Sequence, residues 1–511
     1  MLNSTGRSKM NFIGIDIGTS GTKVVLTDEY GYVKKTCSSE YPLYQPYNGW
    51  AQQDPGDWWN AAVKCLKTVC EGIDKVDAVG LTGQMHGLVM LDENNSVIRP
   101  AIIWCDQRTG AECETITELV GKDKLFDITA APAISSFTAA KIMWVKKNEP
   151  QNYEKCRHIL LPKDYIRFML TGEYASDVSD ASGMQLMDIR GRCWSDEILN
   201  ALGIQKELLA DIYESPEISG YVNSKEVPDC LVGAPVAAGA GDNAAAAVGT
   251  AVVSGGRAFT TIGTSGVVFA HCDEPLIDPL GRIHTFCSAV PGKWHVMGVT
   301  QAAGLSLRWF KDTCCEKETE LAASENIDVY AKLDKMACGS PIGANRLIYL
   351  PYLMGERTPH LDPDARGVFF GLSAMHTKSD MIRSVMEGVS YSLYDCVNIL
   401  ERTGADISEM VICGGGAKSM FWRQMIADVY GMNVKSAECG EGPAYGAAAL
   451  GAVACGAFST VESVCEKWIR FSSVTESDKS AHVQYMKMYE LYSKLYPSLK
   501  DIFSELGKAG K

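Results

Sequence analysis

Residues 12–23 read FIGIDIGTSGTK, a short apolar run that ends in a glycine turn. Residues 258–266 read AFTTIGTSG, so the tetrapeptide Gly-Thr-Ser-Gly occurs twice, at positions 18–21 and 263–266, each time directly after a strand-like run. The repeat predicts two half-molecules that each present a hydroxyl-lined glycine turn. The alternative is two ordinary hairpin turns, because Gly, Ser and Thr are common turn residues.

Turns of this composition suit a phosphate chain. Glycine lets backbone N–H groups approach phosphoryl oxygens closely, and Thr and Ser hydroxyls add donors or reach a metal ion. The isoleucines before the first turn alternate onto one face, so Asp16 points to the opposite face beside the turn. A carboxylate there can hold Mg²⁺ for a nucleotide. We therefore expect a nucleotide and Mg²⁺ near these turns.

Composition narrows the class of protein. The chain has 511 residues, 46% hydrophobic and 22% charged, which is typical of a globular enzyme with two domains of about 200 to 250 residues each. Its net charge of −14 argues against nucleic acid or an anionic membrane as partner, but not against a nucleotide, whose phosphates Mg²⁺ and backbone donors neutralise locally.

Targeting and redox signals are also sparse. No apolar run approaches the roughly 18 residues of a spanning helix, and the first ten residues are polar, so we expect a cytoplasmic protein without a signal peptide. The 18 cysteines are scattered without a Cys-x-x-Cys pair, and we expect them to be reduced. The eight histidines are dispersed, which argues against a zinc site.

Strands alternate with helices along the chain. A meander of strands is expected over 12–17, 22–27 and 32–37, and Asp54-Pro55 opens a helix over 56–70. The second half repeats this order, with strands over 258–262 and 266–270, a long helix over 379–402 that starts at a serine cap, and a charged helical stretch after about residue 460. The pattern predicts layered α/β domains over residues 11–253 and 257–460 and a helical tail over 461–511.

Two familiar nucleotide signatures do not describe this chain. A Walker-type Gly-x-x-x-x-Gly-Lys-Ser/Thr motif is absent from the sequence, and GAGDNA at 239–244 fits the dinucleotide pattern only loosely, because no acidic residue follows at the spacing that a ribose needs. Asp242 makes better sense as a catalytic base. It stands where a strand gives way to a helix, whose dipole favours the ionised carboxylate. An ordinary helix N-cap is the alternative.

Three further segments place polar groups next to turns. Gln84, Met85 and His86 follow a strand and a glycine and could offer hydrogen bonds to a polyol, although a single loop histidine is more often structural. Residues 104–108, WCDQR, could serve sugar hydroxyls or form a salt-bridged surface loop. Residues 414–418, GGGAK, could admit an adenosine close to the backbone or form a plain strand-to-helix turn.

Taken together, these motifs resemble the FGGY family of carbohydrate kinases. The resemblance runs from about residue 11 to beyond residue 456. Residues 136–148, SFTAAKIMWVKKN, match one family signature, and the stretch from GVFFGL at 367 to Glu387 matches a second. Two long patterns in the family's order argue against chance agreement.

The resemblance implies an α/β protein of two ribonuclease H-like (actin-like ATPase) domains with a cleft between them. Within the family, GQMHG at 83–87, LPKDY at 161–165 and GERTP at 355–359 are most similar to members that use ATP to phosphorylate the 5-hydroxyl of D-xylulose. Members that act on glycerol carry an Arg-Glu pair in place of the Met-His pair. Another ketopentose such as L-ribulose, a polyol, or a non-catalytic actin-like ATPase are the alternatives.

The same resemblance assigns roles to single residues. Asp242 would accept the proton, and Asp16 would help to position Mg²⁺ and matter for activity. The implied partners are D-xylulose and ATP, and a homodimer is possible. The implied substrate-binding residues are Gln84, Met85, His86, Trp104, Asp106 and Asn243, and the implied nucleotide-binding residues are Gly18, Thr19, Ser20, Thr22, Lys23, Gly263, Thr264, Gly414, Gly415, Gly416, Ala417 and Lys418.

Overall fold

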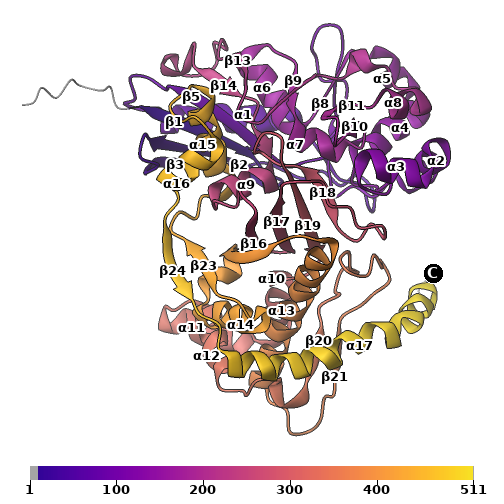
Figure 1. The fold of residues 1–511 in the computed structure, drawn as a ribbon, viewed down its shortest axis with the longest axis vertical. Helices are drawn as coiled ribbons and strands as arrows, with labels where there is room; N and C mark the ends of the chain where they lie inside the picture. The colour runs from indigo at the N-terminus through magenta and orange to yellow at the C-terminus, as the bar shows by residue number, and fades with distance from the viewer. Residues whose placement is uncertain (1–9, 510–511) are drawn as a thin grey trace, which may run out of the picture.

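The computed structural model describes residues 10–509, and its two halves each contain one mixed β-sheet (Figure 1). The strand order of the first sheet is β13-β14-β5-β1-β2-β3, with β15 also paired to β5. Its strands are β1 (Asn11–Ile17), β2 (Gly21–Asp28), β3 (Val33–Glu40), β5 (Ala78–Gly83), β13 (Ile218–Tyr221), β14 (Pro235–Ala237) and β15 (Ala240–Gly241).

The second sheet has the order β18-β19-β17-β16-β22-β23-β24. It lies below the first sheet in Figure 1. Its strands are β16 (Gly256–Ile262), β17 (Gly266–Cys272), β18 (His284–Cys287), β19 (Trp294–Thr300), β22 (Ile407–Cys413), β23 (Val434–Ala437) and β24 (Phe471–Thr475).

The two sheets are built alike. In the first, β3, β2 and β1 form an antiparallel meander, β5 and β14 continue in parallel, and β13 closes the edge antiparallel. In the second, β19, β17 and β16 are likewise antiparallel, with β18 inserted between β17 and β19 in the chain and paired to the outer side of β19. Strands β22 and β23 continue in parallel, and β24 closes the edge antiparallel. Each Gly-Thr-Ser-Gly segment lies at a hairpin turn. The first joins β1 to β2, and the second joins the corresponding strands β16 and β17 of the other sheet. The sequence repeat therefore reflects a duplicated sheet, and the predicted two-domain α/β fold is confirmed.

Helix starts follow local chemistry. Helix α1 (Pro55–Val69) begins as expected, because the Asp54 side chain accepts a hydrogen bond from the backbone N of Gly56 at 2.8 Å. The predicted serine cap of the long helix α13 (Lys378–Thr403) is wrong. Thr377 is the cap, and the Asp380 carboxylate accepts from its backbone N at 2.8 Å and from its hydroxyl at 2.7 Å.

The C-terminal tail differs from the prediction of continuous helix. After α16 (Val461–Trp468), strand β24 pairs with β23 and completes the second sheet before α17 (Lys479–Ala509) begins. The strand is hard to recognise in the sequence because it is an edge strand, with Phe471 and Val474 both exposed. Helix α17 then runs along the second half (Figure 1). None of the helices within residues 10–509 combines the length and apolarity needed to cross a membrane.

One helix joins the two halves. Helix α15 (Gly442–Ala454) lies in the chain between β23 and β24 of the second sheet, but it packs against β1 and β5 of the first sheet and against α9 (Asp242–Gly249) (Figure 1). The contact is so close that a Cβ on Gly14 or Gly80 would lie 1.8 Å from a carbonyl oxygen of α15. A Cβ on Gly446 of α15 would lie 1.9 Å from a carbonyl oxygen of α9. Only glycine permits backbone contact of this kind.

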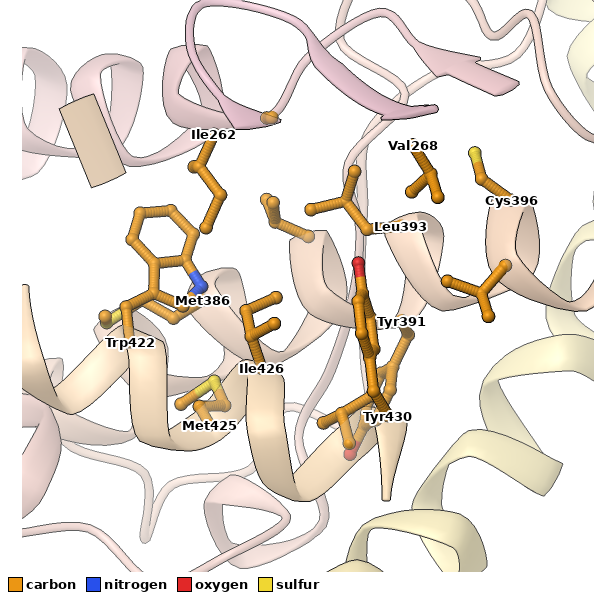
Figure 2. Close-up of a cluster of buried hydrophobic side chains, with 14 of the residues drawn as sticks. Ile262, Val268, Met386, Tyr391, Leu393, Cys396, Trp422, Met425, Ile426 and Tyr430 are labelled. Carbon is orange, nitrogen blue, oxygen red and sulfur yellow. The ribbon is translucent and has the colours of Figure 1, made fainter. Parts of the chain in front are cut away.

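A large apolar cluster holds the second sheet to its helices α13 and α14 (Met420–Tyr430). Figure 2 shows Trp422, Ile426 and Tyr430 of α14 on one side of this cluster, and Ile262, the last residue of β16, on the other. The indole N–H of Trp422 donates to the Ser390 hydroxyl at 3.1 Å, so the ring has a fixed orientation. The cluster therefore anchors the strand end from which the second glycine turn starts.

The glycine contact gives the first prediction. Gly446→Ala should lower the free energy of unfolding by about 1–3 kcal/mol or more, because the methyl group forces α15 away from α9. The measurement is the midpoint of thermal or urea unfolding. Gly110→Ala is the matched control, since a methyl group at this first residue of α2 (Gly110–Val120) meets no atom within 4 Å. Equal midpoints for the two variants would contradict the prediction.

Candidate active site

Asp16 and Asp242 lie together at the ends of two adjacent elements. Asp16 is next to last in β1, and Asp242 is the first residue of α9. Burial, and then the charge of Asp242, raise the pKa of Asp16 to about 7, although Lys23 lowers it. Burial raises the pKa of Asp242 to about 6, against two hydrogen bonds that its Oδ1 accepts from the backbone N and the side-chain amide of Asn243 at 2.7 and 2.9 Å. Both raised values mark the pair as a candidate site for catalysis or for a cation.

Asp242 is not an ordinary capping residue. The N-cap of α9 is Gly241, which has no side chain, and the carboxylate of Asp242 extends from the first helical position. Met85 packs closely here, because a Cβ on Gly241 would lie 2.8 Å from the Met85 sulfur. The structure therefore brings Met85, Asn243 and the two carboxylates together, as the sequence analysis expected of one site.

Polar side chains hold the first glycine turn in shape. The Trp104 indole N–H donates to Thr19 Oγ1 at 2.9 Å, and the Gln53 amide donates to the Thr19 carbonyl at 2.7 Å. The Gln84 amide donates to Gln53 Oε1 at 2.8 Å and to the Gly18 carbonyl at 3.4 Å. Gln84 and Trp104 were predicted to bind substrate. In the structure, the Gln84 amide and the Trp104 indole N–H instead donate hydrogen bonds that hold the first turn.

The other residues predicted around this turn have separate environments. Ser20 is exposed at the tip, and Thr22 is buried in β2. Lys23 forms an ion pair with Glu441, the residue that precedes α15. This pair connects the first turn to the segment that links the two sheets.

Asp106 requires a correction. It was predicted to bind substrate, but its carboxylate is fully buried and accepts hydrogen bonds from the backbone N of Ala51 at 2.6 Å and from Arg108 at 2.6 to 2.9 Å. Both oxygens are thus used within the protein. The Arg108 guanidinium lies beside two indole rings that contact each other, 3.6 Å from the centroid of Trp50 and 4.9 Å from that of Trp144. The alternative of a salt-bridged loop describes this segment, in which the paired side chains of Asp106 and Arg108 are buried and Gln107 is exposed.

His86 presents one free ring nitrogen. Its Nδ1 is 2.8 Å from the carbonyl oxygen of Gly183, so Nδ1 carries the proton and Nε2 is left as an acceptor. Its backbone lies in the left-handed region at φ 69°, and its carbonyl oxygen accepts from the buried Lys141 ammonium at 2.7 Å. Burial, and then the nearby Lys141, lower the pKa of His86 well below its usual value. The imidazole is therefore neutral at pH 7.

Groups from the second half face His86. The ring of Phe286 in β18 lies 6.1 Å from it, and His284 and Arg357 are close enough to lower its pKa further. Arg357 follows Glu356, whose buried carboxylate accepts from the Thr300 hydroxyl at 2.6 Å and from the backbone N of Arg357 at 2.8 Å. The sequence analysis gave these residues no role. Two adjacent charges in GERTP, within an otherwise apolar region, were the available signal.

The second glycine turn borders a cavity of about 480 Å³ in the second half. Gly263, Thr264, Gly415, Gly416 and Lys418 line it, so the two glycine segments predicted to bind nucleotide share one cavity. Gly414 and Ala417 do not line it; Gly414 lies against the backbone of Ile262, and Ala417 packs against the hydrophobic core. The remaining lining residues were not predicted from the sequence, and they include Arg308, Tyr330, Asp334 and Trp422.

The lining of this cavity is chemically mixed. Tyr330 and Trp422 offer aromatic surface, and Arg308 and Lys418 offer positive charge. Arg308 and Tyr330 come from α10 (Gly304–Cys314) and α12 (Val329–Cys338), whose sequences read as ordinary surface helices. A flat ring system that carries phosphates matches this combination of surfaces.

Comparison with known proteins identifies the class. Models of the N-terminal and C-terminal domains of the FGGY family of carbohydrate kinases match residues 11–249 and 258–455. The chain is 37% identical to the xylulose kinase of Bacillus subtilis (strain 168), over 97% of this chain and 98% of the relative. It is 31% identical to the gluconokinase of the same organism, over 97% of each. The ligand-bound xylulose kinase from Lactobacillus acidophilus superposes with a TM-score of 0.89 at 25% identity, over 97% of this chain and 100% of that one.

The protein is thus a sugar kinase. The chain belongs to the FGGY family of carbohydrate kinases, as the signatures at 136–148 and 367–387 predicted.

The correction at Asp106 can be tested. Asp106→Asn leaves the Arg108 charge without a partner in a pair whose side chains are at most 1% exposed, so the thermal midpoint should fall strongly, by the equivalent of about 3–5 kcal/mol. The KM for sugar should not change. Asp196→Asn, which breaks the exposed pair with Lys206, is the control and should be silent in both measurements. A raised sugar KM at unchanged stability would instead place Asp106 at the substrate.

Proposed function

We propose that the protein transfers the terminal phosphoryl group of ATP to the 5-hydroxyl of D-xylulose, giving D-xylulose 5-phosphate and ADP. The observation that carries this proposal is the pairing of Asp242 with Asp16, beside Met85 and a neutral His86. The 37% identity to a xylulose kinase over nearly the whole chain supports D-xylulose as the sugar. D-Gluconate is the second candidate, because a gluconokinase is also a relative and Arg357 could pair with a carboxylate.

Asp242 is the proposed general base. Its carboxylate would accept the proton of the attacking hydroxyl while the oxygen bonds to phosphorus. The neutral His86 would accept a hydrogen bond from another sugar hydroxyl through Nε2. Phosphoryl transfer has a loose transition state, so most of the catalytic effect comes from alignment and from donors that stabilise the phosphoryl oxygens. The glycine turns provide backbone N–H groups for that purpose.

The residues present suit Mg²⁺. Asp16 Oδ1 is buried and has no hydrogen-bond partner among residues 10–509, and burial and the charge of Asp242 raise the pKa of Asp16 despite the opposing charge of Lys23. In the same part of the chain, no group of three or more His, Cys, Asp or Glu side chains is arranged to hold a metal alone. Mg²⁺ commonly uses one or two carboxylates together with phosphates and water. Asp16 would hold the ion. The bound ion would neutralise phosphate charge.

ATP would place its base and ribose in the 480 Å³ cavity of the second half. Tyr330 and Trp422 would contact the adenine base, and Arg308 and Lys418 would attract the phosphates. The cavity borders the second glycine turn, which ends a strand anchored by the cluster of Figure 2. This placement assigns the nucleotide to the second half and the general base, Asp242, to the first half.

A substrate panel tests the proposal. ADP release with Mg·ATP should be fastest with D-xylulose when it is compared with L-ribulose, other ketopentoses, glycerol and D-gluconate. The product should carry phosphate on the 5-oxygen, which phosphorus and carbon NMR distinguish. A higher kcat/KM for D-gluconate or L-ribulose would overturn the choice of sugar, and ADP release that no sugar stimulates would overturn the kinase assignment.

Asp242 should control the pH profile. A base works as the carboxylate, and the folded pKa of Asp242 is raised from 3.8 to about 6, so kcat/KM should fall as pH drops through this value. Asp242→Asn should slow the chemical step by roughly 100- to 10,000-fold and remove this acidic limb. Single-turnover phosphorylation measures the step, with Asp196→Asn as the control. A near-normal rate for Asp242→Asn would exclude it as the base.

His86 should affect sugar binding more than chemistry. His86→Asn suits the left-handed backbone at φ 69° but lacks the Nε2 acceptor, so D-xylulose should bind roughly 5- to 150-fold more weakly. Calorimetric titration measures this loss. His376→Asn, in a loop of the second half where the ring contacts Ser373, is the control. Unchanged affinity in His86→Asn would remove His86 from the sugar site.

A further inference from the structure

A buried segment connects the parts of the site that come from different elements. It starts at Asp177, the last residue of β9 (Ala175–Asp177), and continues through α7 (Val178–Ala181) into the 3₁₀ helix η1 (Ser182–Met184). Its contacts are the Gly183 carbonyl with His86 Nδ1 at 2.8 Å, the Ser182 hydroxyl with the backbone N of Cys287 in β18 at 3.0 Å, and the Ser179 hydroxyl with the backbone N of Gly241 at 3.1 Å.

The Ser179 contact lies nearest to the proposed base. The Ser179 hydroxyl is fully buried and donates to Asp177 Oδ2 at 2.6 Å. Because a hydroxyl has one proton, this donation leaves only its lone pairs for Gly241, whose backbone N–H it accepts. Gly241 is the N-cap of α9, directly before Asp242. The position of the first turn of α9 thus depends on a hydrogen bond to one serine.

A buried cation lies against the carboxylate that accepts the Ser179 hydrogen bond. The Lys163 ammonium lies 2.8 Å from Asp177 Oδ1 and 2.6 Å from Asp164 Oδ1, and its side chain is fully buried. Burial alone would lower the pKa of Lys163, but the neighbouring carboxylates outweigh this effect and raise it. Lys163 is therefore a fixed positive charge, and its contact with Asp177 holds in place the carboxylate to which Ser179 donates.

We propose that Ser179 is a positioning residue for the phosphoryl-transfer reaction, holding the Asp242 carboxylate in place through the backbone N–H of Gly241. The proposal rests on the proposed role of Asp242 as base. Without the hydroxyl, the buried Gly241 N–H would have no partner and the first turn of α9 would shift to find one. A displaced carboxylate slows proton transfer, but it leaves the His86 and nucleotide contacts in place.

Ser179→Ala tests the proposal, with Ser176→Ala as the matched control. The Ser176 hydroxyl is also buried and donates to Asp164 of the same charged cluster at 2.7 Å, but it does not contact α9. Ser179→Ala should lower kcat by roughly 10- to 100-fold with both KM values within about twofold of the wild type. Ser176→Ala should lose similar thermal stability and keep kcat. Equal kcat losses in the two variants, or a change in KM alone, would overturn the proposal.

A double-mutant cycle separates positioning from general destabilisation. If Ser179 acts through Asp242, adding Ser179→Ala to Asp242→Asn should slow single-turnover phosphorylation by less than about threefold. If the rate reductions of the two single variants multiplied in the double variant, Ser179 and Asp242 would act independently, and the proposal would be overturned. Ser179→Cys keeps the volume with a poor hydrogen-bonding group, and should reproduce the kcat loss even if the alanine variant does not fold. Absence of sugar-dependent ADP release in the wild type would instead defeat the proposed function, before any variant is compared.

Discussion

The close contact of α15 with the first sheet is the constraint on which the rest of the structure depends. Helix backbone meets strand backbone at Gly14 and Gly80, where any side chain would overlap a carbonyl oxygen. Strand β1 carries Asp16 near its end, beside the first turn, and β5 leads into the loop that carries His86. The same helix meets α9 at Gly446, so the element that presents Asp242 rests on it as well. A helix that lies between two strands of the second sheet in the chain therefore sets the relative positions of the main polar groups of the first half.

Most polar groups of the site have hydrogen-bond partners within the protein, and a few do not. Gln84 and Trp104 are used to hold the first turn, and Asp106 is used by Arg108. Asp16 Oδ1 keeps no protein partner among the described residues, and a buried unpaired carboxylate oxygen costs stability. Protein groups with unused hydrogen-bonding capacity are the ones available to ligands. This distinction, which burial alone does not make, separates the supporting residues from the proposed catalytic ones.

The sequence was sufficient for the fold and for part of the site. The repeated turn predicted the duplicated hairpins because strand, glycine and hydroxyl residues are adjacent in the chain, and local chemistry of this kind is visible in sequence. Strand β24 was missed because none of its residues is buried, so it lacks the alternating pattern of a half-buried strand, and the serine cap was misplaced because Thr377 uses Asp380 three residues later. Arg357, Arg308 and Ser179 were missed for a different reason. Their partners lie far away in the chain, so only the tertiary structure shows the contacts.

The duplication also explains how two similar turns come to have different environments. In the first half, the side chains of Trp104 and Gln84 close around the turn and leave Asp16 as the polar group at its base. In the second half, the corresponding turn is packed against Gly304 and Gly416 without such side chains, and a cavity opens beside it. A cation needs a compact carboxylate, whereas a nucleoside needs volume. The two copies thus have complementary properties, and a phosphate chain that spans them would join the proposed nucleotide cavity to the proposed base.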